Sequence, residues 1–363
     1  MRLPRLVIKD FTLENCIFQG GMGVGVSLHP LVGAVSQEGG FGIVSSAGLR
    51  TIVSKCEGKP FSNYAAVRNE LERAQSASGG RPVGINIMRA VVEYEDTVKA
   101  SIDAGVGAII SGAGLPLDLP TIQNPGHTAL IPIVSSARAL RIILRSWERA
   151  GYRPDAVVVE GPLAGGHLGF KPEEIDDPAF TLENILIPVL EMAHQHGDFP
   201  VIAAGGVYTH EDIVRFLAMG ASGVQMGTRF LATNESSASD AYKQAVVAAG
   251  KDDITVVSYP NMTPASPCGL PFRLLKGSLM YRDGHVPRCK YGYVKQRGQE
   301  GKLACKAMPT AEHPEGYLCI CAGLVASAGY DDEAPMLYTA GSNVDRIDRI
   351  RSVAELMAEL RGE

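Results

Sequence analysis

Eight short apolar runs recur along the first 250 residues, and segments with helical spacing separate most of them. Each run is continuous rather than alternating in polarity, which is typical of parallel strands buried on both faces. Several runs close on glycine or a small polar residue. The predicted strands are Ile17–Phe18 (continuing into Gln19), Phe41–Ser46, Val83–Met88, Ala108–Ser111, Leu130–Ser135, Ala156–Glu160, Val201–Ala204 and Gly223–Met226.

The segments between these runs place apolar residues on one face of a helix. Four such faces are evident: Val92, Val98 and Ile102; Leu140, Ile143, Leu144 and Trp147; Leu186, Val189, Leu190 and Ala193; and Ile213, Phe216 and Leu217. The last of these helices has a capping box, with Thr209 as the cap and Asp212 three residues later. A further helix is expected over Ser237–Ala249.

This alternation predicts an α/β fold, a (β/α)8 barrel (TIM barrel) that occupies residues 1–250. A doubly wound open sheet is the alternative. It usually carries G-x-G-x-x-G after its first strand, whereas Gly21, Gly23 and Gly25 lack the third glycine at the required offset. Residues 251–363 are rich in proline and hold five of the seven cysteines. We expect them to form an irregular C-terminal extension or cap that is helical only over Val344–Arg361.

Composition narrows the class of protein. A chain of 363 residues with 45% hydrophobic and 20% charged residues is an ordinary globular protein. The net charge of −5 argues against nucleic-acid binding. No signal peptide and no apolar run near 18 residues are evident, so we expect a cytoplasmic protein without membrane contact. Glycine, 41 of 363 residues or about 11%, exceeds the usual value of roughly 7%, which indicates tight turns or backbone close to a ligand.

The carboxyl ends of the strands are the expected active site of a barrel. Gly205 and Gly206 follow the seventh strand, and Gly227 and Thr228 follow the eighth, where many barrels bind a phosphate on backbone N–H groups. The alternative is that these glycines merely allow the chain to turn. Further candidates for cofactor binding at strand ends are Gly21, Met22, Gly23, Asn86, Ser111, Glu160, Gly166 and Gln225.

His167 is the candidate catalytic residue because it lies in a glycine-flanked loop over the predicted barrel mouth. Its imidazole could remove a proton from a carbon acid or donate a hydrogen bond to a developing anion. Glu160 could bind ligand hydroxyls, orient His167 or form an ion pair at the barrel rim. The side-chain amides of Gln19 and Asn86 could form hydrogen bonds with the edge of a heterocycle or with the backbone. We expect His127, His194 and His196 to be surface or structural residues.

Cys289, Cys305, Cys319 and Cys321 are separated by 15, 13 and 1 residues, with no C-x-x-C pair. The usual zinc-ribbon and iron–sulfur signatures are therefore absent, and we assign no metal ligands. Buried thiols are the expected role for these cysteines. Two segments of the extension, Ser266–Leu270 and Thr339–Asn343, are candidates for contact with a substrate.

Together these motifs resemble the nitronate monooxygenase family, formerly called 2-nitropropane dioxygenases. The resemblance rests, in order, on Gln19-Gly20-Gly21-Met22, Gly84-Ile85-Asn86-Ile87-Met88, Glu160-Gly161 with Ala164-Gly165-Gly166-His167, Ala203-Ala204-Gly205-Gly206-Val207 and Gln225-Met226-Gly227-Thr228-Arg229-Phe230. It implies an FMN barrel in which Gly21–Gly23, Asn86 and Gly166 line the flavin ring. Gly205, Gly206, Gly227 and Thr228 would hold the phosphate, and His167 would be the active-site histidine.

The activity implied by this resemblance is oxidation of alkyl nitronates, or nitroalkanes, by O2 to a carbonyl compound and nitrite. Flavin-type enoyl-acyl carrier protein reductases and NADH:quinone reductases use a similar FMN barrel, so an NAD(P)H-dependent reductase is the first alternative. A non-catalytic FMN-binding or metal-sensing protein is the second. Leu168-Gly169-Phe170, which follows the histidine, departs from the family pattern and is expected to form an apolar lid. A homodimer is one oligomeric state open to the chain.

Overall fold

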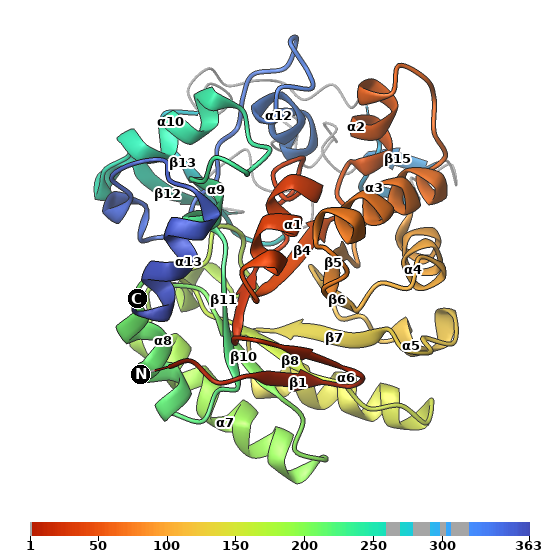
Figure 1. The fold of residues 1–363 in the computed structure, drawn as a ribbon, viewed down its shortest axis with the longest axis vertical. Helices are drawn as coiled ribbons and strands as arrows, with labels where there is room; N and C mark the ends of the chain where they lie inside the picture. Colours follow the sequence, from red (N-terminus) through yellow and green to blue (C-terminus); the bar gives the residue numbers. More distant parts are fainter. Residues whose placement is uncertain (1, 259–268, 279–290, 298–302, 306–318) are drawn as a thin grey trace.

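The computed structural model describes residues 2–258, 269–278, 291–297, 303–305 and 319–363 of the chain. Eight parallel strands close into a barrel in the order β10-β11-β3-β4-β5-β6-β7-β8 (Figure 1). The strands are β3 (Ile17–Gln19), β4 (Phe41–Ser45), β5 (Val83–Met88), β6 (Ala108–Gly112), β7 (Ala129–Val134), β8 (Val157–Glu160), β10 (Val201–Ala204) and β11 (Gly223–Met226). Each coincides with one of the eight predicted runs, so the barrel is confirmed.

Helices follow the barrel strands and cover their outer surface (Figure 1). They are α1 (His29–Gln37), α2 (Leu49–Cys56), α3 (Asn63–Ala77), α4 (Tyr94–Asp103), α5 (Leu119–Ile122), α6 (Ala137–Arg149), α7 (Leu182–Gln195), α8 (His210–Ala218), α9 (Thr228–Leu231) and α10 (Asp240–Ala248). On α6 all four predicted apolar residues are at most 1% exposed. On α8 the predicted capping box forms, with the Asp212 amide donating to Thr209 Oγ1 at 3.2 Å. The prediction for α4 is wrong at Val92, which precedes the helix and is 50% exposed.

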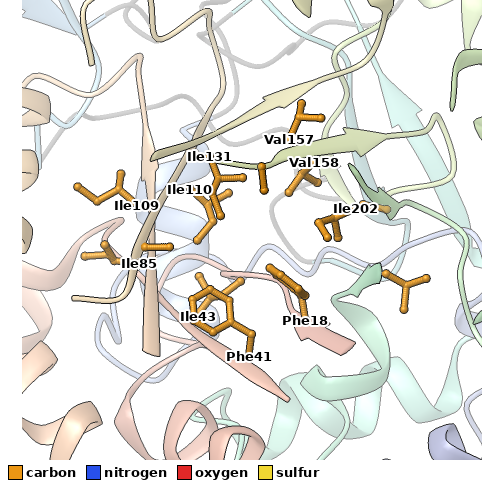
Figure 2. Close-up of a cluster of buried hydrophobic side chains, with 14 of the residues drawn as sticks. Phe18, Phe41, Ile43, Ile85, Ile109, Ile110, Ile131, Val157, Val158 and Ile202 are labelled. Atoms are coloured by element: carbon orange, nitrogen blue, oxygen red, sulfur yellow. The ribbon is translucent and has the colours of Figure 1, made fainter. Parts of the chain in front are cut away.

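The barrel interior is filled by branched and aromatic side chains from neighbouring strands, as Figure 2 shows for Phe18, Phe41 and Ile110 among others. The rings of Phe18 and Phe41 meet edge to face with centroids 5.1 Å apart. An antiparallel hairpin, β1 (Leu6–Ile8) and β2 (Phe11–Leu13), precedes the first barrel strand, and its buried residues join the same core. The barrel is therefore a packed core, and a ligand can enter only beyond the strand ends.

The C-terminal extension contains more regular structure than the sequence predicts. Strands β12 (Ile254–Val257) and β13 (Phe272–Leu275) form an antiparallel sheet with β9 (Gly166–His167), and β14 (Lys295–Arg297) pairs with β15 (Leu303–Cys305). Helix α12 (Ile320–Ser327) is also unpredicted. Most residues of this helix are buried. A helix that is buried on nearly every side has apolar residues all round, so its sequence shows no alternation of apolar and polar residues with a period of 3.6.

The predicted helix over Val344–Arg361 is wrong in extent. Val344–Arg346 forms a single 3-10 turn, and the helix α13 covers only Val353–Arg361. Ser352 Oγ accepts a hydrogen bond from the Glu355 amide at 3.1 Å, and the Glu355 carboxylate accepts one from the Ser352 amide at 2.8 Å. This capping box fixes the start of α13, because the Ser352 backbone is extended.

Helix α13 packs against α1 and α8, in the position where a barrel would carry the helix of its eighth strand (Figure 1). Leu356, Met357 and Leu360 are fully buried in the main core cluster. Helix α10, which the sequence predicts after the eighth strand, packs instead in a separate cluster beside the 3-10 turn at Val344–Arg346. Residues far beyond 250 thus complete the helical layer. Within the described part of the chain, no helix is long and apolar enough to cross a membrane.

Candidate active site

A cavity of about 300 Å³ opens at the carboxyl ends of the barrel strands. Twelve residues were predicted to bind a cofactor, and eleven of them lie on its wall together with His167. They are Gly21, Met22, Gly23, Asn86, Glu160, Gly166, Gly205, Gly206, Gln225, Gly227 and Thr228. Barrel closure brings these positions, which are spread over more than 200 residues of sequence, to a single site.

The first strand ends in glycines because its loop runs against other backbone and side chains. A Cβ on Gly21 would lie 2.5 Å from the Cβ of Asn86, and one on Gly23 would lie 2.8 Å from Ser45 Oγ. The loop is anchored where the Met22 amide donates to Ser27 Oγ at 2.9 Å. The main chain at Gly21–Gly23 therefore forms part of the cavity wall directly.

The opposite end of the cavity is formed by the last two barrel strands. Gly205 and Gly206 have φ values of +87° and +101°, a region that favours glycine, and a Cβ on Gly205 would lie 2.7 Å from the carbonyl oxygen of Gly161. The segment Thr339–Asn343 lies across this end: the Gly341 amide donates to Thr228 Oγ1 at 2.8 Å, and Asn343 Nδ2 donates to the Gly206 carbonyl at 2.7 Å. The Thr228 hydroxyl accepts this bond and keeps its own proton to donate.

Glu160 and Gln225 lie at one level of the barrel, because both are in register with Ala204 on the strand between them. Gln225 is 9% exposed, and its Oε1 has no hydrogen-bond partner among the described residues. Burial raises the pKa of the Glu160 carboxyl from 4.5 to about 7. The cavity floor thus offers an unused amide acceptor and a carboxyl that is partly protonated near neutral pH.

His167 lies on β9, in the loop that follows β8, and lines the same cavity. Its ring meets Phe272 edge to face, with centroids 4.9 Å apart. Burial lowers the pKa of the imidazole from 6.5 to about 4, so the ring is neutral at pH 7. A neutral imidazole has one N–H to donate and one nitrogen to accept a hydrogen bond.

Ser111 is the predicted site residue that the fold does not bring to the cavity. It is fully buried, and its hydroxyl donates to the Ile87 carbonyl at 3.0 Å and contacts the Tyr94 hydroxyl at 3.1 Å. Gln19 likewise serves the protein itself: its Nε2 donates to Ser27 Oγ at 2.8 Å and its Oε1 accepts from the Ile43 amide at 3.1 Å. Sequence position placed both residues correctly along their strands, but their side chains bond to other protein groups instead of facing the cavity.

Three histidines predicted to be surface or structural residues, His127, His194 and His196, contact acidic side chains. His127 contacts Asp10 at 2.7 Å, His194 contacts Asp198 at 3.3 Å, and His196 contacts Glu148 at 3.0 Å. None of these three lines the cavity, whereas His167 does.

The predicted apolar lid after His167 is wrong. Leu168 and Phe170 are 0% and 5% exposed and belong to the main core cluster. They anchor the loop rather than cover the cavity. Of the extension segments expected near a substrate, Thr339–Asn343 lines the cavity, whereas Gly269 and Leu270 lie beside a separate pocket and residues 266–268 lie outside the described residues.

Among the cysteines of the extension, Cys321 lines the cavity and Cys319 is buried at the start of α12. Cys289 lies outside the described residues, and Cys305 is described only as part of the backbone of β15. Within the part of the chain that the structure covers, no three His, Cys, Asp or Glu side chains gather in a way that could hold a metal ion.

Sequence reasoning predicted Thr339–Asn343 but missed the other residues that the extension brings to the site. Phe272 on β13 pairs with His167 on β9 and lines the cavity, the next residue, Arg273, pairs with Gly166, and Tyr293 forms another part of the wall. No periodic or motif signal marks these residues. Only a predicted pairing of β13 with the loop after β8 could have found them.

The chain is similar in sequence and in fold to several known proteins. A nitronate monooxygenase from Pseudomonas aeruginosa is 30% identical over 72% of this chain and 78% of its own length. A (3aS,4S,5R,7aS)-5-hydroxy-7a-methyl-1-oxo-octahydro-1H-indene-4-carboxyl-CoA dehydrogenase from Mycobacterium tuberculosis is 29% identical over 77% of this chain and 68% of its own length. The solved structure of FabK from Thermotoga maritima, 26% identical, covers 96% of this chain and 92% of its own, with a TM-score of 0.70.

The closed barrel, the similarity to these enzymes and the fold shared with FabK define the class: the protein is a flavin-dependent oxidoreductase. The model of the nitronate monooxygenase family matches residues 5–363. The chain therefore belongs to the nitronate monooxygenase family, as the motifs predicted.

Proposed function

We propose that the protein is an FMN-dependent nitronate monooxygenase that converts alkyl nitronates and O2 to carbonyl compounds and nitrite. The observation that carries this proposal is a neutral His167 facing a cavity whose floor and far end are built from glycine backbone and hydrogen-bonding side chains. Such a cavity suits a large flat heterocycle with a phosphate at one end and a small anionic substrate near the histidine.

The residues present fit a flavin. Gln225 Oε1 is a buried acceptor that needs a donor, which a ligand hydroxyl or imide N–H would supply. Gly205, Gly206, Gly227 and Thr228 would hold the phosphate, and Gly21–Gly23 with Asn86 would line the ring. Because Thr339–Asn343 is hydrogen-bonded across the phosphate end, the site favours a mononucleotide over a dinucleotide.

The chemistry supplied by bound FMN is electron transfer from the substrate to O2. The part of the chain itself is to orient the substrate and to stabilise its charge. His167 would donate its ring N–H to a nitronate oxygen, where the negative charge lies. Phe272 supports the imidazole from the side and keeps it in an apolar surrounding.

The neutral state of His167 also bears on the substrate. A base whose conjugate acid has a pKa of about 4 removes a carbon-bound proton poorly at pH 7, because the ideal catalytic pKa lies near the working pH. A nitronate has already lost that proton. We therefore favour alkyl nitronates over neutral nitroalkanes as substrates.

A reductase or dehydrogenase acting on acyl thioesters is the second candidate, since the indene-4-carboxyl-CoA dehydrogenase from M. tuberculosis resembles this chain about as closely as the Pseudomonas nitronate monooxygenase does. The two proposals are separated by the electron donor. The test is to identify the flavin released from the purified protein by mass and to mix the anaerobic protein with propionate 3-nitronate or with NADH. We expect FMN, and bleaching of its absorbance by the nitronate alone. Bleaching by NADH alone would favour the reductase.

A further inference from the structure

The loop that carries His167 is held by the C-terminal extension on several sides. The backbone of β9 pairs with β13, and the Leu168 amide donates to the Pro271 carbonyl at 2.9 Å. On the other side a Cβ at Gly165 would lie 2.6 Å from the carbonyl carbon of Ala340, so glycine is required there. The extension therefore sets the path of the loop.

Arg273 makes the side-chain contacts within this arrangement. The residue is 5% exposed, and its Nη1 donates to the carbonyls of Pro162 at 2.7 Å and Ala164 at 2.9 Å. The Nε of Arg273 is buried without a hydrogen-bond partner among the described residues. Burying a cation is costly, so a buried guanidinium bonded to two loop carbonyls indicates a position that the fold requires.

Neighbouring residues of β13 act on opposite ends of the same loop. Phe272 pairs with His167 and packs its ring against the imidazole, while Arg273 pairs with Gly166 and binds the residues that precede the histidine. Because successive side chains of a strand point to opposite faces, one residue can fix the ring while the next fixes the base of the loop.

We propose that Arg273 is a positioning residue for His167: by bonding the Pro162 and Ala164 carbonyls it holds the loop so that the imidazole faces the cavity. Arg273 does not line the cavity itself, so it acts through the loop. The proposal rests on the proposed catalytic role of His167. A lysine would replace it poorly, because its single ammonium lacks the spread donors and planar shape of the guanidinium.

The first test measures the loop and requires no turnover. Hydrogen exchange is followed by mass spectrometry in the full-length, flavin-loaded wild type, in Arg273→Met, which keeps an apolar stem, and in Arg273→Lys. Arg361→Met is the matched control, because Arg361 is another arginine of the extension and pairs with Glu38 and Glu363 away from the loop. We expect amides 163–168 to exchange about 10- to 100-fold faster in Arg273→Met, with a smaller increase in Arg273→Lys and none in Arg361→Met.

The second test asks whether Arg273 acts through His167. We expect Arg273→Met to lower kcat for nitronate oxidation about tenfold or more in the wild-type background and to have almost no further effect in a His167→Asn background. If Arg273 had a purely structural role, Arg273→Met would lower kcat by the same factor in both backgrounds. Unchanged exchange of amides 163–168, or equal losses in both backgrounds, would overturn the proposal. If Arg273→Met does not fold, the Lys variant decides by the same criteria. Failure of the wild type to oxidise nitronates would refute the proposed function, and the exchange result would still decide the role of Arg273.

Discussion

Glu160 gives a quantitative prediction, because its carboxyl is buried at the cavity floor without an opposite charge that lowers its pKa. The pKa of Glu160 is about 7 in the folded protein and 4.5 when the side chain is not buried. Between these two values the folded state binds more protons than the unfolded state, so the contribution of Glu160 to stability falls as the pH rises from 4.5 to 7. Above pH 7 the loss reaches a plateau.

The size of this loss follows from the shift in pKa. Each pKa unit corresponds to about 1.4 kcal/mol, so the carboxylate costs at most about 3.5 kcal/mol above pH 7. Replacing Glu160 with glutamine removes the titration and keeps the shape of the side chain. The flavin-free Glu160→Gln variant should therefore match the wild type in stability at pH 4 and exceed it at pH 8. With an unfolding entropy of roughly 2.1 cal/mol/K per residue, the gain in Tm at pH 8 is at most about 5 °C.

The assay is thermal unfolding of both flavin-free proteins across this pH range. Glu173→Gln is the control, because Glu173 is an exposed carboxylate on the same β8–α7 connection, and its replacement should change Tm equally little at every pH. A difference between Glu160→Gln and wild type that does not grow between pH 4 and pH 8 would show that burial does not perturb Glu160, and the reasoning would fail.

Three further predictions concern the rest of the cavity. Gly205→Ala should weaken flavin binding at least tenfold, since a Cβ would meet the Gly161 carbonyl at 2.7 Å and the φ of +87° disfavours alanine. Gly250→Ala should leave flavin binding unchanged, because Gly250 has a negative φ and no atom lies closer than 3.5 Å to the added Cβ. Fluorescence titration of the two apoproteins with flavin measures both affinities. Thr228→Val removes the acceptor of the Gly341 amide and should lower flavin affinity about tenfold in the same titration, and an unchanged affinity would speak against a phosphate contact at Thr228. His167→Asn should retain flavin and lower kcat for nitronates about a hundredfold in steady-state kinetics, and full activity would exclude the proposed role of the histidine.

The barrel could be predicted from sequence because its strands are buried on both faces and appear as continuous apolar runs. The same logic located the site, since the carboxyl ends of parallel strands meet on one side. It failed for Ser111, because a position at a strand end does not tell whether a hydroxyl faces the cavity or bonds to Ile87 and Tyr94 inside the protein.

The extension was the least predictable part for a physical reason. Helix α12 is buried on most sides and has no amphipathic pattern, and β13 is defined by its pairing with β9, more than 100 residues earlier in the chain. Arg273 therefore looks like any charged residue until its contacts with Pro162 and Ala164 are seen. Leu168 and Phe170 were misplaced as a lid because apolar residues beside a catalytic loop can equally anchor that loop in the core.

The central claim is that the protein oxidises nitronates with O2. The most direct test is to follow oxygen consumption and nitrite release by the flavin-loaded protein with propionate 3-nitronate as the substrate, beside its parent nitroalkane 3-nitropropionate at a pH where the carbon next to the nitro group remains protonated. We expect nitronate-dependent oxygen uptake with release of nitrite, and much slower uptake with the carbon-protonated form. No nitronate-dependent oxygen uptake by protein with bound FMN would contradict the account.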